Sequence, residues 1–370
     1  MKKYLFFLLV FVTVVLLSCS QKTGADSAVE PVDTLVVDKI IPELQAGEFF
    51  YKTENPFGEI ISLTGEQVVI DTIIFKTSGA EMIVKNNSIL VKNRGENVLM
   101  SFRLPDFELL SLNGIYGSGP DEFVYPNLVA TPDPSLIAYV FESSNQKLYQ
   151  FDKNGKLNLS DFSFTQKKNR SHSDKQVVNV GQNDFMYAET SDTGKSIFRI
   201  TQIGDSIDVR EVFNLALNSK RKSWTNYIGD FAVNPKQNRM VYAYKYFKMI
   251  KFMDMEAETV RTINFERAEF DESTNYKIDG LDQNVTHYWG VCAQDDYVYF
   301  LYSGRTPFEV GREHGKHIHY IYVEQYDWNG NPIACYKLDR WGYFTVDEKN
   351  KKIYLMSTND DDPFFVYDLP

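Results

Sequence analysis

Short runs in which apolar and polar residues alternate fill the chain from about residue 80 to its end. One run, at 137–141, reads Ile-Ala-Tyr-Val-Phe, and the next, at 147–151, reads Lys-Leu-Tyr-Gln-Phe. Alternation with a period of two, in segments rich in Tyr, Phe, Val and Ile, predicts β-strands. No segment shows a convincing long helical period. The pattern therefore predicts an all-β protein.

Turn signals separate these runs. The pair Asn154-Gly155 follows the strand at 147–151, and Asn329-Gly330 follows a strand that ends near Tyr326. Asn-Gly is the strongest short hairpin signal, because a tight turn there needs a positive φ. The same strand, turn and strand therefore recur at distant places in the chain.

Internal repetition organises the strands into units. Weaker copies of the unit pair 185–188 with 197–200, 240–244 with 250–252, and 353–356 with 365–367. The third strands of the units end near Phe102, Phe151, Ile200, Phe252, Tyr326 and Tyr367. Their spacing is about 50 residues with one longer interval, and four strands per unit at that period are typical of a β-propeller. We expect a six-bladed β-propeller with four-stranded antiparallel blades; a β-sandwich or a pair of β-domains is the alternative.

The last unit lacks an outer strand, because the chain stops at Pro370 just after the third strand. An exposed sheet edge is a liability that folded proteins avoid. The segment 59–75 precedes the first full unit and contains the apolar residues Ile60, Ile61, Leu63, Val68, Val69 and Ile70. We therefore predict that an N-terminal strand from this segment closes the ring, and that the propeller spans residues 49–370.

The first eighteen residues have the pattern of a signal peptide. Lys2 and Lys3 precede a 14-residue apolar stretch from Tyr4 to Leu17, which is too short to span a bilayer comfortably. The stretch ends in Leu-Leu-Ser-Cys19, which resembles the lipobox of bacterial lipoproteins. The resemblance implies removal of residues 1–18, diacylation of Cys19, and a lipidated tether over 19–48. An ordinary secretory peptide is the alternative.

One motif is more specific than the repeat. Residues 117–123 read Gly-Ser-Gly-Pro-Asp-Glu-Phe, with Pro126 three residues further on. This resembles the linker between blades of NHL-type and TolB-like six-bladed propellers, although Asp121 stands where the pattern has glycine and the other units lack the motif. The mature chain as a whole resembles a TolB-like propeller lipoprotein of gut-type Gram-negative bacteria. The resemblance implies a six-bladed propeller fold and a location in the cell envelope, and it supplies no catalytic residue.

Composition narrows the function classes. Aromatic residues make up 15% of the 370 residues, which excludes a disordered chain. Loss of Lys2 and Lys3 with the signal peptide changes the formal net charge from −11 to −13, so a generic nucleic-acid binder is not expected. Of the three cysteines, Cys19 is the lipid anchor that the lipobox resemblance implies. Cys292 and Cys335 lie in strands of one unit that should not be neighbours, so we expect free thiols, with a disulfide as the alternative.

No catalytic motif stands out. The chain has no G-x-S-x-G, no phosphate-binding loop, no H-E-x-x-H and no C-x-x-C, so we expect no cofactor and no metal, and we lean away from an enzyme. The acidic clusters at 295–296 and 360–362 lack calcium-loop spacing and are interpreted as turn residues. His317 and His319 alternate as in a strand and would project to one side, as two metal ligands do. The preferred interpretation is a polar loop that enters a strand, with a metal site as the alternative.

Loop placement suggests a binding face. The loops between second and third strands and those between blades open on one face of a propeller, and ligand sites tend to lie on such loops. All five histidines are expected on that face or its rim, while the Asn-Gly, Asn-Pro and Asp-Asp turns gather on the opposite face. The candidate binding residues are Lys167, Lys168, Arg170, Lys220, Arg221, Lys222, Arg305, Arg312, His314, His317 and His319. The alternative is that these loops are charged only because they face water.

These features predict a lipid-anchored envelope protein, in the inner or outer membrane and facing the periplasm. Its propeller is expected to bind a protein or carbohydrate ligand without catalysis. A partly basic face suits an anionic glycan or a carboxylate. Two alternatives remain: a metal-assisted lactonase, lyase or hydrolase that acts at the central channel, and a purely structural partner in an envelope assembly.

Overall fold

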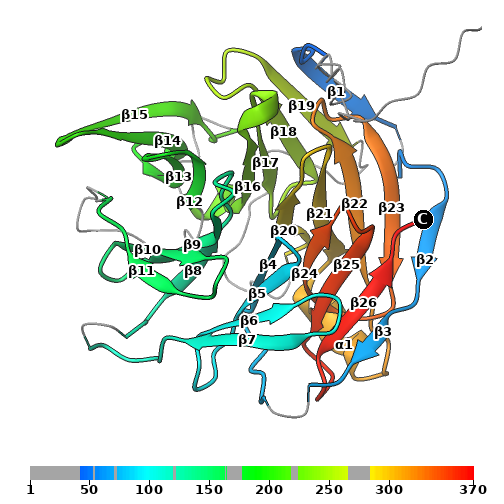
Figure 1. The fold of residues 1–370 in the computed structure, drawn as a ribbon. Helices are drawn as coiled ribbons and strands as arrows, with labels where there is room; N and C mark the ends of the chain where they lie inside the picture. Colours follow the sequence, from blue (N-terminus) through cyan, green and yellow to red (C-terminus); the bar gives the residue numbers. More distant parts are fainter. Residues whose placement is uncertain are drawn as a thin grey trace, which may run out of the picture. The chain divides into compact units, whose positions relative to one another are not determined.

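Six sheets follow one another along the chain and surround a common centre (Figure 1). The computed structural model describes residues 42–52, 55–70, 73–119, 122–162, 164, 177–217, 224–265 and 284–370, all within one compact unit. The innermost strand of each sheet contacts the innermost strands of both neighbouring sheets, and the last contacts the first. The sheets are therefore the blades of a closed six-bladed β-propeller, as the repeat predicted.

The first three blades each contain four consecutive antiparallel strands. Blade 1 consists of β4 (Glu81–Lys85), β5 (Ser88–Lys92), β6 (Leu99–Arg103) and β7 (Glu108–Asn113). Blade 2 consists of β8 (Pro126–Val129), β9 (Leu136–Glu142), β10 (Lys147–Asp152) and β11 (Leu157–Leu159). Blade 3 consists of β12 (Val177–Gly181), β13 (Asp184–Ser191), β14 (Gly194–Ile203) and β15 (Ser206–Asn214).

The last three blades recruit strands from the N-terminal part of the chain. Blade 4 consists of β16 (Gly229–Asn234), β17 (Arg239–Tyr244), β18 (Met249–Met253) and β19 (Val260–Phe265). Blade 5 consists of β20 (Thr286–Ala293), β21 (Tyr297–Arg305), β22 (Ile321–Asp327) and β23 (Pro332–Leu338). Blade 6 consists of β24 (Gly342–Asp347), β25 (Lys352–Ser357), β26 (Phe364–Asp368) and the early strand β3 (Glu66–Val68).

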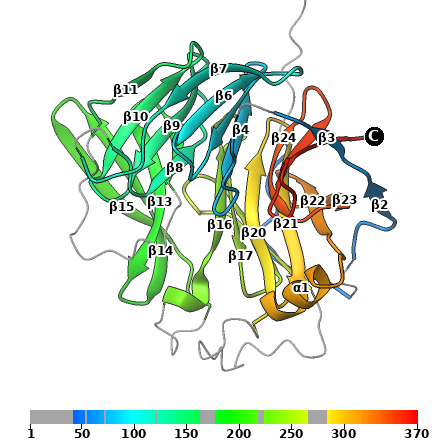
Figure 2. The same ribbon diagram turned by 90° about the horizontal axis from the view of Figure 1, so that it is seen from below.

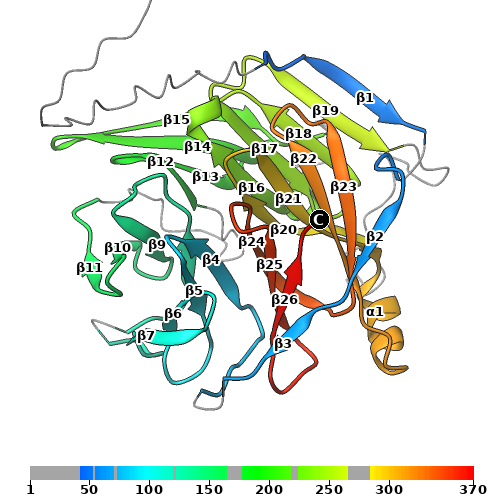
Figure 3. The ribbon, with the colours of Figure 1, turned by 45° about the vertical axis from the view of Figure 1, so that its right-hand side comes forward.

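Ring closure follows the prediction. β3 lies within the segment 59–75 and pairs antiparallel with β26, where Gln67 faces Phe365 in the register. Blade 6 thereby gains the outer strand that its own sequence lacks. Figure 3 shows β3 beside β26, where the N-terminal part of the chain reaches blade 6.

Two further N-terminal strands were not predicted. β1 (Gly47–Tyr51) pairs parallel with β19, and β2 (Ile60–Leu63) pairs parallel with β23. Blades 4 and 5 thus carry a fifth strand on their outer edges (Figure 3). Parallel pairing at an edge leaves no hairpin signal in the sequence, so the alternation alone could not assign these strands a partner.

Apolar residues pack between the blades. The buried residues form six clusters, and each joins two adjacent blades. In the cluster between blades 4 and 5, for example, the rings of Phe252 and Tyr326 lie 6.0 Å apart. The abundant aromatic residues therefore hold neighbouring blades together, as β-sheets packed face to face require.

The third strands and turns lie where the repeat placed them. The six marker residues, from Phe102 to Tyr367, all fall in β6, β10, β14, β18, β22 and β26. In the Asn-Gly turns, Gly155 and Gly330 have φ of 78° and 80°, a conformation that favours glycine. These turns join third and fourth strands on the face expected for them.

Helices are few among the described residues. The helix α1 (Pro307–His314) lies in the long connection between β21 and β22, and η1 (Trp224–Tyr227) and η2 (Pro235–Gln237) are single turns. The sequence analysis missed α1, which begins with a capping box made by Thr306 and Glu309. No helix in the described part of the chain is both long enough and apolar enough to cross a membrane.

Candidate functional site

A cavity of ≈630 Å³ runs along the centre of the ring and is lined by the innermost strands of all six blades. We call it the central channel. Each of these strands has a hydrogen-bonded strand neighbour on one side only, so its other edge faces the channel. Half-buried apolar side chains line the wall, one or more from each blade: Ile83, Leu128, Val178, Val233, Val291 and Tyr343. The middle of the channel is therefore largely apolar.

Aromatic rings lie near the beginning of the innermost strands. Trp289 of β20 and Tyr343 of β24 both line the channel, and their ring centroids are 5.6 Å apart. Trp289 also packs on the buried Trp341, at 4.9 Å. The Tyr343 hydroxyl accepts a hydrogen bond from the Gly79 amide, which fixes its direction. These rings, tilted by 36–37° to one another, form an apolar wall between blades 5 and 6.

Charged side chains gather where the innermost strands end. Lys85, Lys236 and Asp295 line the channel there. The Lys85 ammonium donates to the Thr131 carbonyl at 2.7 Å and to the Asp133 carbonyl. Burial lowers the pKa of Lys85, and the nearby Lys236 lowers it further, whereas Asp133 raises it. Lys236 forms an exposed ion pair with Asp295 at 2.8 Å.

Polar amides add to this end of the channel. Lys349 also lines the cavity, as do the asparagines Asn86, Asn179, Asn234 and Asn350. Asp347 accepts hydrogen bonds from the backbone and side chain of Asn350. Its carboxylate is therefore already hydrogen-bonded within the turn that follows β24. The side-chain amides of these four asparagines already donate to protein oxygen atoms, so the groups that this end can offer to an anionic ligand are the lysine ammoniums.

The two thiols are free and lie on different strands of blade 5. Cys292 of β20 lines the channel, and its sulfur contacts the Val346 amide at 3.4 Å. Cys335 of β23 is buried. Burial raises the pKa of both thiols, which keeps them protonated and weakly nucleophilic. The expectation of free thiols is confirmed.

Six of the predicted binding residues lie outside the described residues: Lys167, Lys168, Arg170, Lys220, Arg221 and Lys222. The lipidation site Cys19 also lies outside them. Of the other five candidates, Arg305 ends β21, and the remaining four belong to the connection between β21 and β22 that contains α1: Arg312, His314, His317 and His319. Figure 2 shows α1 at the lower edge of the ring, beside the ends of β20 and β21.

Arg305 is not an open loop residue. It is the last residue of β21, and it is only 9% exposed. Its guanidinium pairs with Glu313 of α1, donates to the Tyr320 carbonyl at 2.7 Å, and stacks over the Tyr320 ring at 3.7 Å. The charge of Arg305 therefore holds α1 against the blade.

The structure brings together a different pair of histidines from the expected one. Residues 315–320 form a turn and an irregular segment, not a strand, and His317 is exposed with φ of 59°. This segment is therefore a polar loop that leads into β22, as the sequence analysis preferred, and His317 and His319 do not alternate along a strand. His319 instead lies beside His314, with ring centroids 4.8 Å apart. Arg312 stacks on Phe308 within α1.

Asn359 of blade 6 joins this histidine pair. Its side-chain nitrogen lies 2.8 Å from Nδ1 of His319 and 3.3 Å from Nδ1 of His314. The His314 ring also meets the edge of Trp341 at 5.7 Å. Burial, His319 and Arg305 lower the pKa of His314, while Glu313 raises it. No group of three or more His, Cys, Asp or Glu side chains within the described ranges is arranged to hold a metal.

The glycine-rich motif at 117–123 has a structural role in its described part. The Glu122 carboxylate accepts a hydrogen bond from the Gly119 amide at 2.8 Å, and a Cβ at Gly117 would lie 1.9 Å from that carboxylate. Phe123 is buried between blades 1 and 2. The motif therefore shapes the connection between these blades.

Sequence reasoning missed the channel residues. Lys85, Lys236 and Trp289 come from three different blades, and no motif links them. The one available signal was position: Lys85 ends the first strand of its blade, Lys236 lies two residues after the first strand of its blade, and asparagines lie near both. Residues at such positions converge once the blades close into a ring.

Comparisons with known proteins support the fold. The chain is similar to the crystal structure of a member of the DUF4221 family from Bacteroides vulgatus, with 12% identity, a TM-score of 0.52, and coverage of 82% of this chain and 96% of that one. It is also similar to the crystal structure of a Bacteroides fragilis protein whose name gives export only as a prediction. The identity is 13%, the TM-score is 0.51, and the match covers 86% of this chain and 98% of that one. No protein-family model matches the chain. No curated protein matches it either.

Proposed function

We propose that this protein is exported, is anchored in the cell envelope by lipid on Cys19, and binds a small ligand in its central channel. The ligand we propose has an apolar body and one anionic group, such as a carboxylate. The signal-peptide pattern and lipobox support export and anchoring, and the structural neighbour named as exported is consistent with them. The channel supports ligand binding.

The observation that carries the binding proposal is the character of the channel wall. Its volume of ≈630 Å³ lies within the range of small-molecule sites, which are about 300–1,000 Å³. Such sites are mostly apolar with a few placed polar groups. Here the apolar wall extends from Trp289 toward Lys85 and Lys236, so an apolar body could lie along the wall with its anion near the lysines. This volume favours a carboxylate over an extended acidic glycan.

A thermal-shift panel tests the binding proposal. Aromatic and aliphatic carboxylates are compared with their uncharged amides, with the full chain as the target. A ligand present at about 100 times its Kd stabilises the folded state by about 2.7 kcal/mol, so a matching carboxylate should raise Tm while its amide should not. No response to any carboxylate would contradict the proposal.

Variants locate the site. Lys85→Met and Lys236→Met should each weaken carboxylate binding by about tenfold, because a hydrogen bond to a charged group contributes about 1.5 kcal/mol or more. Lys352→Met is the matched control, because Lys352 pairs with Asp368 on the neighbouring strands of blade 6 and does not line the channel. Equal affinities in all three variants would place the ligand elsewhere.

Fractionation tests the anchor. Cys19→Ala should move the protein from the membrane fraction to the soluble fraction, because a lipid chain contributes about 0.8 kcal/mol per buried CH₂ and nothing replaces it. Retention of the variant in the membrane fraction would contradict lipid anchoring through this residue.

A further inference from the structure

A second site is suggested by the junction of blades 5 and 6. α1 ends at His314, and the chain then turns through residues 315–317 and returns to His319. The connection between β25 and β26 brings Asn359 to the same place. The two histidines are thus held side by side by one insertion, and the asparagine comes from the next blade.

Two imidazole nitrogens converge on one point. Nδ1 of His319 and Nδ1 of His314 lie 2.8 and 3.3 Å from the same Asn359 side-chain nitrogen. A ring nitrogen that accepts a hydrogen bond carries an unprotonated lone pair. Two such lone pairs aimed at one point repel each other unless a donor or a cation lies between them. The amide of Asn359 supplies the donor here.

We propose that His314, His319 and Asn359 bind a divalent transition-metal ion, such as Zn²⁺, at this point. Neutral imidazoles are ligands suited to zinc, copper and nickel. The ion would replace the amide nitrogen, with each histidine moving inward to the usual Zn–N distance of about 2.0–2.1 Å. Rotation of the Asn359 amide would present its oxygen as the third ligand, which leaves a fourth position for water or a ligand.

The surroundings suit a cation. His314 is the last residue of α1, and the C-terminal end of a helix favours positive charge. Arg305, a cation close enough to act on His314, is paired with Glu313. Asp360, which follows Asn359, lies 3.5 Å from Arg340 and accepts a hydrogen bond from Ser357. The proposed ion does not depend on ligand binding in the central channel.

Calorimetric titration with Zn²⁺ tests this site, with the full chain purified without a histidine tag. We expect saturable binding of one ion. His314→Ala and His319→Ala should each weaken it by at least about tenfold, since even residues that only orient metal ligands change affinity by about 10–100-fold. Asn359→Asp should strengthen binding, because a carboxylate replaces a neutral ligand.

His317→Ala is the matched control. His317 lies in the same insertion and is exposed, so its removal should leave the affinity unchanged within about twofold. Circular dichroism checks whether each variant is folded. If a histidine variant is unfolded, the Asn359→Asp variant still tests the site. Absence of saturable binding, or equal affinity in the His314, His319 and His317 variants, would overturn the proposal. The three residues would then only hold the insertion to blade 6 by hydrogen bonds.

Discussion

At the scale of single residues, Glu348 is a carboxyl group whose pKa is raised well above its ordinary value. It lies in the turn between β24 and β25, and it accepts a hydrogen bond from the Asp296 amide at 3.2 Å. Burial raises its pKa to about 7, and the charges of Asp296 and Asp295 raise it as well. The folded protein therefore keeps a proton that the unfolded chain, with a pKa of 4.5, has lost.

This difference makes stability depend on pH. A carboxyl whose folded pKa is raised contributes its full stability below pH 4.5, and that contribution is lost as pH rises through 7. We expect Glu348→Gln to flatten the fall in Tm between pH 5 and pH 8 and to raise Tm at pH 8. Thermal unfolding across that range measures both effects.

Glu309 supplies the control for this prediction. Hydrogen bonds from the Thr306 backbone and side chain lower the pKa of Glu309, so this residue is ionised throughout the range. Glu309→Gln should leave the slope of Tm against pH unchanged between pH 5 and pH 8. A wild-type Tm that does not fall over this range would contradict the assigned role of Glu348.

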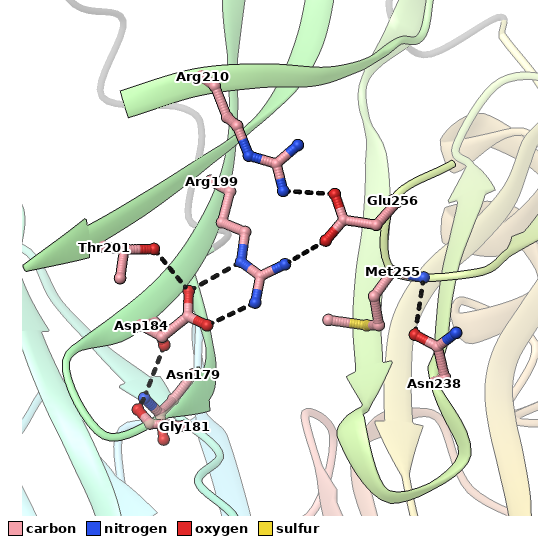
Figure 4. Close-up of polar contacts among 9 residues, drawn as sticks. All are labelled: Asn179, Gly181, Asp184, Arg199, Thr201, Arg210, Asn238, Met255 and Glu256. Atoms are coloured by element: carbon pink, nitrogen blue, oxygen red, sulfur yellow. Dashed lines mark hydrogen bonds and ion pairs between the residues drawn. The ribbon is translucent and has the colours of Figure 1, made fainter. Parts of the chain in front are cut away.

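At the scale of elements, neighbouring blades are joined by ion pairs as well as by apolar packing. Figure 4 shows Arg199 of β14 between Asp184 of blade 3 and Glu256 in the turn between β18 and β19. Its guanidinium donates to Asp184 at 3.0 and 2.6 Å and to Glu256 at 2.6 Å. Arg210 of β15 also pairs with Glu256. The bond to Asp184 is the main reason that the pKa of Arg199 is raised.

The two arginines should differ in their contribution to stability. The Arg199 side chain is 21% exposed and bonds two carboxylates, whereas Arg210 is 46% exposed and bonds one. We expect Arg199→Met to lower the free energy of unfolding by about 1–2 kcal/mol, because Asp184 loses its charged partner and keeps only the weaker hydrogen bond from the Thr201 hydroxyl. Arg210→Met should cost less than about 1 kcal/mol, as exposed ion pairs usually do. Urea unfolding measures the difference, and an equal or larger loss in Arg210→Met would show that the interface does not depend on Arg199.

At the scale of the whole molecule, three segments of the N-terminal chain attach to successive blades. β1 pairs with blade 4, β2 with blade 5 and β3 with blade 6. Only β3 completes a four-stranded blade; β1 and β2 add a fifth strand to blades that are already complete. The closing contact of the ring therefore depends on the shortest of the three.

Deletion of residues 59–75 should unfold the ring, because blade 6 would lose its outer strand and expose the edge of β26. Deletion of residues 47–51 is the matched control, since it removes only β1, the fifth strand of blade 4. We expect the first variant to lose its cooperative unfolding transition and the second to keep it with a lower midpoint. A 59–75 deletion with wild-type stability would show that β3 does not close the ring.

Much of the fold could be predicted because its signals are local. Alternation identifies strands such as β9 and β10, and Asn-Gly marks the turns after β10 and β22. Repetition then counts the blades. The parallel strands β1 and β2 and the helix α1 escaped prediction, since edge pairing depends on a distant partner and α1 is a short insertion with a weak pattern.

The sequence by itself determined the ring of six blades, the need for a closing strand, and the identity of the segment that provides it. Only the tertiary structure decided which side chains meet. Lys85 and Lys236 come together because first strands of different blades end at the same end of the channel. His314 meets Asn359, 45 residues away, because the insertion in blade 5 folds back toward blade 6. Strand identity depends on near neighbours in the chain, whereas a site depends on the paths of loops that bring distant residues together.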